Sequence, residues 1–141
     1  MPAIPALDHC NLFAARQASR FMSQLYERHL VKAKLTASQF SILSVIHHCP
    51  GIVMTDLATA LVMDRTSLLR ALKPLSRDGL VCESANTPAS RRLSLSLTEA
   101  GQQRYRDALQ LWKIAQQEYE AIVGADEATS LRQSLLAISR S

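Results

Sequence analysis

The chain is poor in glycine and cysteine, and it contains no long run of apolar residues. Among its 141 residues are four glycines and three cysteines. The glycines form no phosphate-cradling loop, and neither a Gly-x-Ser-x-Gly nor a Cys-x-x-Cys motif occurs, so the common signatures of nucleotide-binding, hydrolytic and redox enzymes are missing. We therefore predict that the protein is not an enzyme and uses no cofactor.

The lack of a long apolar run argues against a membrane helix, which needs about 20 consecutive apolar residues. Residues 1–5 have no basic region followed by an apolar core, so they do not resemble a secretory signal. Hydrophobic residues make up 48% of the chain, which is typical of a globular protein. We expect one soluble domain over residues 1–141, located in the cytoplasm.

The three cysteines, Cys10, Cys49 and Cys82, have no paired spacing, so we predict no disulfide framework. We expect Cys49 and Cys82 to be packed. Cys10 lies at the start of an expected helix, where the helix dipole favours a reactive thiolate, and it is a candidate redox site.

Two adjacent histidines, His47 and His48, raise the question of a metal site. On a helix their side chains point roughly 100° apart, which makes a poor pair of ligands without further partners. We expect them to complement the negative end of their helix instead, and we predict no metal.

The most informative stretch is 55–98. Thr55 is expected to cap a short helix, with Asp56 in its first turn. Asp64 can cap a second helix that ends at Gly79. The apolar positions of this second helix recur at helical spacing: Leu68, Leu72 and Leu75.

The other face of the second helix carries long cations and short hydroxyls, which donate to phosphates and to base edges in a major groove. These residues are Arg65, Thr66, Ser67, Arg70, Lys73 and Arg77. The competing interpretation is an ordinary solvated helix face, which would leave the next segment unexplained.

That next segment is a hairpin. After residues 80–82 comes a turn-rich segment, 86–90, and then 93–97 alternates strictly between leucine and serine, which predicts a half-buried strand. Arg91 and Arg92 lie beside the tip, where an arginine can enter a narrow minor groove. An ordinary basic turn remains the alternative.

These segments, in this order, resemble the motifs of the MarR family of bacterial transcriptional regulators. The resemblance covers nearly the whole chain. The matching segments are 35–43, 63–70, 72–75, 79–81, 91–92 and 97–101. It implies a mainly α fold with a small β-hairpin wing, namely a winged helix-turn-helix with N- and C-terminal dimerisation helices. It also implies a homodimer, most simply a repressor, that binds a pseudo-palindromic operator in double-stranded DNA and is released by a small ligand or an oxidant.

Residue roles follow from the resemblance. We expect Lys73 and Arg91 on phosphates and Arg92 in the minor groove, with the major groove read by Arg65, Thr66, Ser67 and Arg70. Two positions depart from the family pattern: Ser90 stands where an aspartate usually helps to hold the wing, and Leu69 where a threonine is common.

The resemblance also bears on release from DNA. In this family a pocket between the dimerisation helices and the DNA-binding lobe often takes small aromatic acids, but no residue here identifies such a ligand. Some members sense peroxides through a cysteine, and that position falls near Leu12 rather than Cys10 in this chain.

The segments outside the central stretch read as long amphipathic helices. Thr36 and Gln39 form a capping-box pattern, and Thr98 is expected to cap a helix that stops at Gly124, before a last helix from about 126 to 138. We expect residues 8–32 and 99–140 to form dimerisation helices around a DNA-binding lobe at 36–97. Pairing across a two-fold axis would place two reading helices roughly 34 to 36 Å apart.

Two alternatives remain open. The apolar stripes of the long helices could pack within one chain as a monomeric core. The winged helix could also serve protein contacts alone, because a fold does not dictate its use. The cations that would be aligned on one side discriminate against the second alternative: Arg65, Arg70, Lys73, Arg91 and Arg92.

Overall fold

The structure is a computed structural model that describes residues 2–85 and 92–141. In these residues the elements follow one another as α1 (Pro5–Asp8), α2 (Asn11–Leu30), the 3-10 turn η1 (Val31–Ala33), α3 (Ala37–His48), β1 (Ile52–Val53), α4 (Met54–Leu61), α5 (Arg65–Arg77), β2 (Val81–Ala85), β3 (Leu93–Leu97), α6 (Glu99–Val123) and α7 (Ala125–Ser139).

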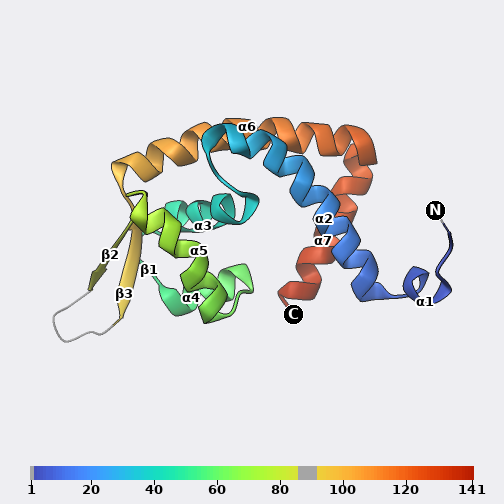
Figure 1. The fold of residues 1–141 in the computed structure, drawn as a ribbon, viewed down its shortest axis with the longest axis horizontal. Coiled ribbons are helices and arrows are strands. Elements are labelled where there is room, and N and C mark those ends of the chain that lie inside the picture. Colours follow the sequence, from blue (N-terminus) through green and yellow to red (C-terminus); the bar gives the residue numbers. More distant parts are fainter. Residues whose placement is uncertain (1, 86–91) are drawn as a thin grey trace.

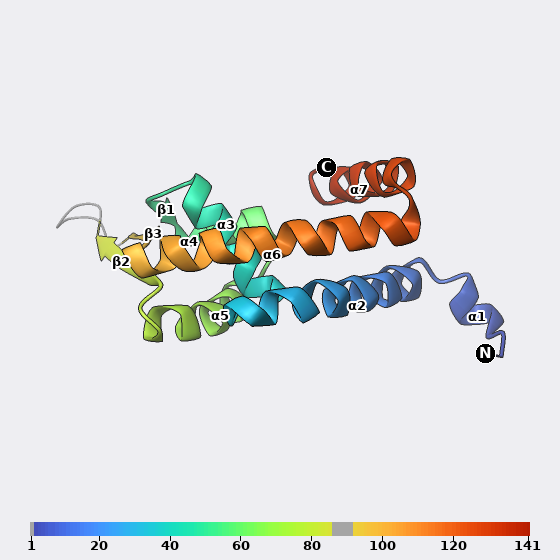
Figure 2. The same cartoon turned by 90° about the horizontal axis from the view of Figure 1, so that it is seen from above.

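The helices form two regions joined by α6 (Figure 1). The first region, which we call the lobe (residues 36–97), contains α3, α4, α5 and the sheet. The second, the helical arm, consists of α2, α7 and residues 111–123 of α6. Seen from above, α6 has α2 along one side and α7 along the other (Figure 2). No helix in the described part of the chain is long and apolar enough to cross a membrane.

The sheet is antiparallel, with strand order β1-β3-β2. The predicted hairpin of β2 and β3 is confirmed, with Val81 opposite Leu97. The short β1, which the sequence pattern did not predict, pairs Ile52 with Leu95. Gly51 precedes it with a φ of 83° and donates its backbone N–H to the Leu95 carbonyl oxygen at 2.9 Å. This pairing makes β3 the central strand.

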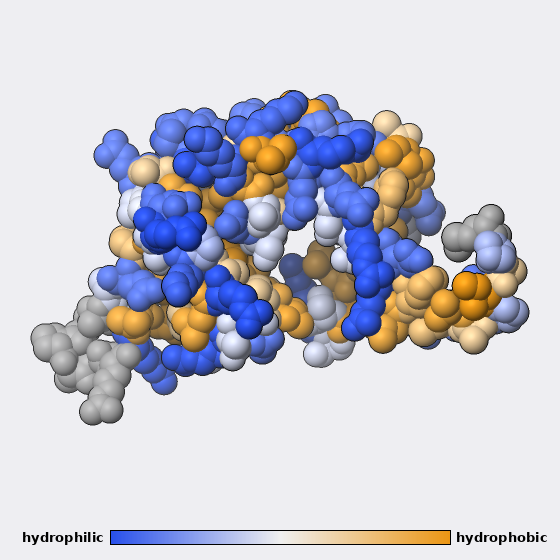
Figure 3. All heavy atoms as spheres, in the orientation of Figure 1, coloured by the Kyte–Doolittle hydropathy of each residue, from blue (hydrophilic) through white to orange (hydrophobic). Residues whose placement is uncertain are grey.

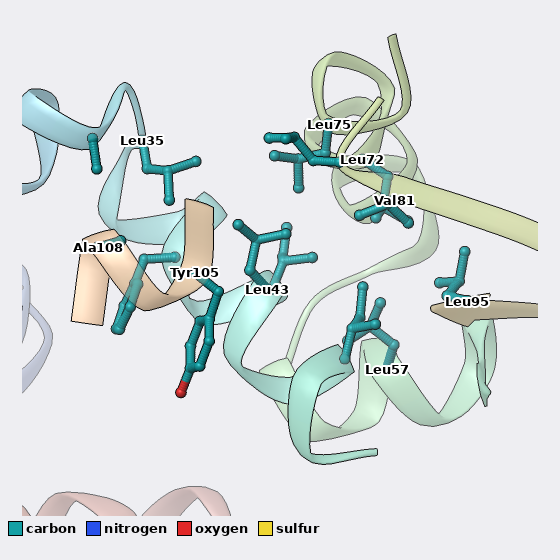
Figure 4. Close-up of a cluster of buried hydrophobic side chains, with 14 of the residues drawn as sticks. Leu35, Leu43, Leu57, Leu72, Leu75, Val81, Leu95, Tyr105 and Ala108 are labelled. Atoms are coloured by element: carbon teal, nitrogen blue, oxygen red, sulfur yellow. The ribbon is translucent and has the colours of Figure 1, made fainter. Parts of the chain in front are cut away.

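The core of the lobe is built from all of its elements and from α6 (Figure 4). Leu43, Leu57 and Leu95 are fully buried, and burying a leucine contributes about 1.5 to 3 kcal/mol. Tyr105 and Ala108 bring α6 into this core. Gly101 lets α6 approach closely, because a Cβ there would collide with the backbone of Leu80.

Most of the predicted helix ends are confirmed. The capping box of Thr36 and Gln39 is present, and the Thr98 hydroxyl accepts the Gly101 N–H at the start of α6. Gly79, with a φ of 72°, follows α5 and lets the Leu80 N–H donate back to the Leu75 carbonyl oxygen at 2.9 Å, the closure expected at such an end.

Two expected helix starts are wrong. Thr55 is not a cap, because α4 already begins at Met54 and its N-cap residue Val53 makes no side-chain cap. The expected helix from residue 8 is divided: α1 ends at Asp8, and α2 begins at Asn11 with Cys10 as its N-cap. In both places the helix begins directly after another element: α4 follows β1 without a gap, and α2 follows α1 after two residues.

The burial expected along β3 is wrong at its first two residues. Leu93 is 43% exposed and Ser94 only 4%. Ser94 lies between β1 and β2 in the central strand, where its hydroxyl donates to the Ser84 carbonyl oxygen at 3.0 Å. Leu93 lies at the end of the hairpin nearer the tip, so its side chain stays in solvent. Alternation therefore predicted the strand and its leucine face correctly, since Leu95 is completely buried and Leu97 packs against the core, but it predicted neither the exposure of Leu93 nor the burial of Ser94.

The expectation that Cys49 and Cys82 are packed is also wrong, since both are exposed. Cys49 follows the last turn of α3, next to Pro50. Cys82 pairs with Ser96 on the open side of the sheet.

Candidate nucleic-acid interface

The amino-terminal end of α5 is fixed by Asp64. One carboxylate oxygen accepts the Ser67 N–H at 2.8 Å, and the other accepts the Ser67 hydroxyl at 2.8 Å. These two hydrogen bonds, the backbone one first, lower the pKa of Asp64. The predicted cap is thus confirmed. Ser67, however, already uses its hydroxyl proton in the cap, so toward DNA its oxygen can only accept.

Burial of one face of α5 fixes which residues point outward. Leu68, Leu72 and Leu75 are at most 2% exposed. The opposite face is exposed and carries the cations that the sequence pattern indicated, in helical register along four turns. These exposed residues are Arg65, Thr66, Leu69, Arg70, Lys73 and Arg77. Arg77 also pairs with Asp78 at 3.4 Å, so its charge is partly compensated.

A proline, Pro74, lies inside α5. The helix continues past it, and the Asp78 N–H donates to the Pro74 carbonyl oxygen at 2.9 Å. The missing N–H of Pro74 therefore does not end the helix before Arg77.

The wing approaches the start of α5. Arg92, immediately before β3, is exposed and lies with Arg65 on one hollow of about 190 Å³. Val53, Met54 and Thr55 complete part of its wall. The predicted helix and wing cations thus face one space. Arg91 and Ser90 fall outside the described residues.

One charged residue near this surface escaped the sequence analysis. Glu83 on β2 lines the hollow with Arg65 and Arg92, and it also lines a second hollow with Lys73 and Arg77. The strand pattern of β2 indicated its direction, since Glu83 lies two residues after the buried Val81 and therefore on the same face of the sheet, toward α5.

The other candidate residues lie apart from this surface. Cys10 is half-buried, and its Sγ accepts the Phe13 N–H at 3.4 Å. His47 contacts the Gln102 side-chain oxygen through Nδ1 at 2.8 Å, and His48 contacts the Ser44 carbonyl oxygen through Nδ1 at 2.8 Å. Only His48 therefore meets a carbonyl at the end of α3. Among the residues described, no three His, Cys, Asp or Glu side chains gather as a metal site.

Comparison with known proteins gives one consistent family. The model of the MarR family matches residues 35–92. The homoprotocatechuate degradative operon repressor of Escherichia coli is 31% identical over 137 residues, which cover 94% of this chain and 93% of the relative.

Two solved structures of similar chains contain DNA. The transcriptional regulator MosR of M. tuberculosis, in complex with DNA, is 32% identical with a TM-score of 0.82, covering 94% of this chain and 95% of MosR. A cysteine-to-serine mutant of MarR from E. coli, complexed with operator DNA, is 26% identical with a TM-score of 0.78, covering 89% and 90%. With a relative this similar over nearly its full length and a matching fold, the chain belongs to the MarR family of winged helix-turn-helix transcriptional regulators.

Proposed function

We propose that the protein is a sequence-specific repressor that acts as a homodimer on a pseudo-palindromic operator. The observation that carries the proposal is the shared hollow of Arg65 and Arg92, because it lets α5 and the wing engage neighbouring grooves of one duplex. The E. coli relative, itself named a repressor, supports the direction of control. As a regulator of genes, the protein is expected in the cytoplasm.

The exposed face of α5 supports the assignment of roles. Arg65, Thr66 and Arg70 lie in its first two turns, the part of a recognition helix that contacts base edges. Lys73 lies one turn further and suits a phosphate. Ser67 would accept from a base amino group. Arg92, with Arg91, would follow the backbone into the minor groove.

The helical arm supports the dimer. Leu135 and Ile138 of α7 are 45% and 73% exposed, and Leu12 and Phe21 of α2 are 58% and 51% exposed. Apolar side chains gather over α1 and the start of α2 on the face shown in Figure 3, whereas hydrophilic side chains cover the next part of α2 there. Large apolar side chains that are exposed together in this way favour a contact with another protein.

A groove between α2 and α7 indicates how the second copy would fit. Its volume is about 780 Å³, and its wall on α2 is made of small residues, including Ala14 and Ala18, opposite Leu135 and Ile138. Small residues on α2 that face Leu135 and Ile138 leave room for a helix from a second copy of the chain. The occupant we propose is the arm of a second copy, related by a two-fold axis.

Release would follow binding of a small aromatic acid or oxidation. The relative's name links it to degradation of homoprotocatechuate, so this compound is the first effector to test. Cys10, at the start of α2, is the residue to test for oxidation. Loss of operator binding on adding homoprotocatechuate would support the first route. Loss on adding an organic hydroperoxide that Cys10→Ser abolishes would support the second.

DNA binding itself is tested by selection from a random-sequence duplex library, followed by titration of the selected site with salt. We expect an inverted repeat and an affinity that falls steeply with salt. Arg70→Ala should lose about 1 to 3 kcal/mol of discrimination between bases. The control Arg106→Ala removes the same charge from α6, where Arg106 is exposed and contacts Gln103, and should bind as wild type does.

The outcomes separate the two candidate functions. Recovery of no sequence, with weak binding even at low salt, would favour the module that serves protein contacts alone. Equal effects of Arg70→Ala and Arg106→Ala would contradict the reading role of α5.

A further inference from the structure

The space between α5 and the wing consists of two hollows, which together we call the α5–wing trough. The hollow at the start of α5 contains Arg65 and Arg92, and the one further along α5 contains Lys73 and Arg77. Among the residues that line them, Leu69 and Glu83 are shared by both. A carboxylate therefore lies at the middle of a trough in which the other charged side chains, as far as the structure describes them, are cations.

Glu83 adds no polar contact to the described part of the fold. Its side chain is exposed and makes no hydrogen bond or ion pair with any residue that the structure describes. Glu118, in contrast, is held by Arg28 at 2.8 Å and by His29. Asp64 is held by Ser67. The carboxylate of Glu83 thus has no partner among residues 2–85 and 92–141, and it lies on the side of the lobe that the proposed function turns toward DNA.

The position has two consequences for a duplex in the trough. A phosphate that lies against Glu83, rather than at the Lys73 end of the trough, meets a negative charge, and the repulsion grows as water is displaced. A base edge that presents an amino group meets an acceptor, and a Glu carboxylate is the usual partner of the cytosine N4 amino group in the major groove. Leu69, 45% exposed beside it, supplies an apolar wall rather than a competing donor.

We propose that Glu83 is a specificity-determining residue of this regulator. Its carboxylate disfavours binding in which a phosphate lies directly against it at the middle of the α5–wing trough, and it accepts from a cytosine amino group when the correct sequence is bound. The proposal rests on the proposed function, because it assigns Glu83 a part in the same DNA complex.

Two variants separate the two effects. Glu83→Gln removes the charge but keeps an oxygen acceptor, whereas Glu83→Ala removes both. The control is Asp107→Asn, which removes the same charge from an exposed position on α6. Thermal unfolding of each variant checks that the fold is intact. Binding is measured on a duplex of random sequence and on the site selected by the wild-type protein.

Glu83→Gln should raise the affinity for random duplex about 3- to 10-fold and steepen its salt dependence by up to about one ion. The affinity for the selected site should change less. Glu83→Ala should raise random binding similarly and, in a repeated selection, lose the preference for cytosine at one position of each half-site. Asp107→Asn should leave the ratio of specific to random binding unchanged.

Any of three results would overturn the proposal: unchanged binding by both variants, an equal change on both duplexes, or an unchanged selected sequence for Glu83→Ala. Failure of the proposed function looks different, because the wild-type protein would then select no sequence at all.

Discussion

The lobe and the helical arm differ in how much of their apolar surface one chain covers. In the lobe, Leu57, Leu68 and Leu95 are completely buried. In α7 the one buried residue is Ala128, while Leu135 and Ile138 remain exposed. The lobe therefore has its own core and can hold a reading surface rigidly. The arm has an apolar stripe without a cover, which is what a segment needs if its partner is another chain.

The largest expected effect is the loss of unfolding free energy when a cavity is made in the core of the lobe. Leu68→Ala removes a fully buried side chain on the inner face of α5 and should cost about 3 kcal/mol of unfolding free energy. Leu136 on α7 is 38% exposed, so Leu136→Ala should cost far less in the unfolding of dilute protein. Urea unfolding followed by circular dichroism measures both. Equal losses would mean that α7 is part of a single-chain core.

The second effect acts on the arm alone. Leu135→Asp places a charge in the groove between α2 and α7, where a second copy would bury it unpaired. The dimer dissociation constant should rise at least about tenfold, which is 1.4 kcal/mol. Sedimentation velocity over a range of concentrations measures it, with Ser130→Asp, also on α7 and exposed, as the matched control. A variant that stays dimeric would move the interface elsewhere.

The same contrast explains what the sequence could predict of the fold. Caps and helices rest on neighbouring residues, as at Thr36, Asp64 and Thr98, and these predictions are confirmed. The two-residue strand β1 has no periodicity of its own and exists only through its pairing with β3. That pairing also buries Ser94, which no local pattern marks as an inward residue.

The site was predictable to a similar depth. The cations of α5 share one helix, so their common face follows from helical spacing. Glu83 reaches that face from β2, and its place depends on how the hairpin packs against α5. Sequence reasoning within one helix could not supply that packing, although the alternation of β2 gave its direction.

A smaller effect on stability is expected from backbone strain at one exposed residue of the lobe. Val62, between α4 and α5, has a φ of 53° and is 71% exposed. This left-handed conformation costs a β-branched residue about 1 to 2 kcal/mol, and asparagine tolerates it much better. Val62→Asn should therefore stabilise the lobe by about 1 kcal/mol, measured as a higher thermal midpoint. Destabilisation would show that the Val62 side chain makes a contact worth more than the strain.

The smallest effect concerns the polar contacts that hold α2 to α6 outside the lobe core. The hydrogen bond from His29 and the charge of Arg28 lower the pKa of Glu118. A carboxyl whose pKa is depressed on folding stabilises the protein above its unfolded value, which is 4.5, and this stabilisation disappears as the pH falls through the folded pKa.

Between about pH 6 and pH 3, the wild-type protein should thus lose slightly more stability than Glu118→Gln does. The difference should be small and should shrink further in high salt, because the pair is exposed to solvent. Asp107→Asn, which removes a charge from an exposed position in the middle of α6, is the control and should follow the wild-type curve. If Glu118→Gln followed the wild-type curve as well, the contacts of Glu118 would contribute nothing to holding α2 against α6, and apolar packing around Leu25, Ala115 and Tyr119 would be left to hold the arm.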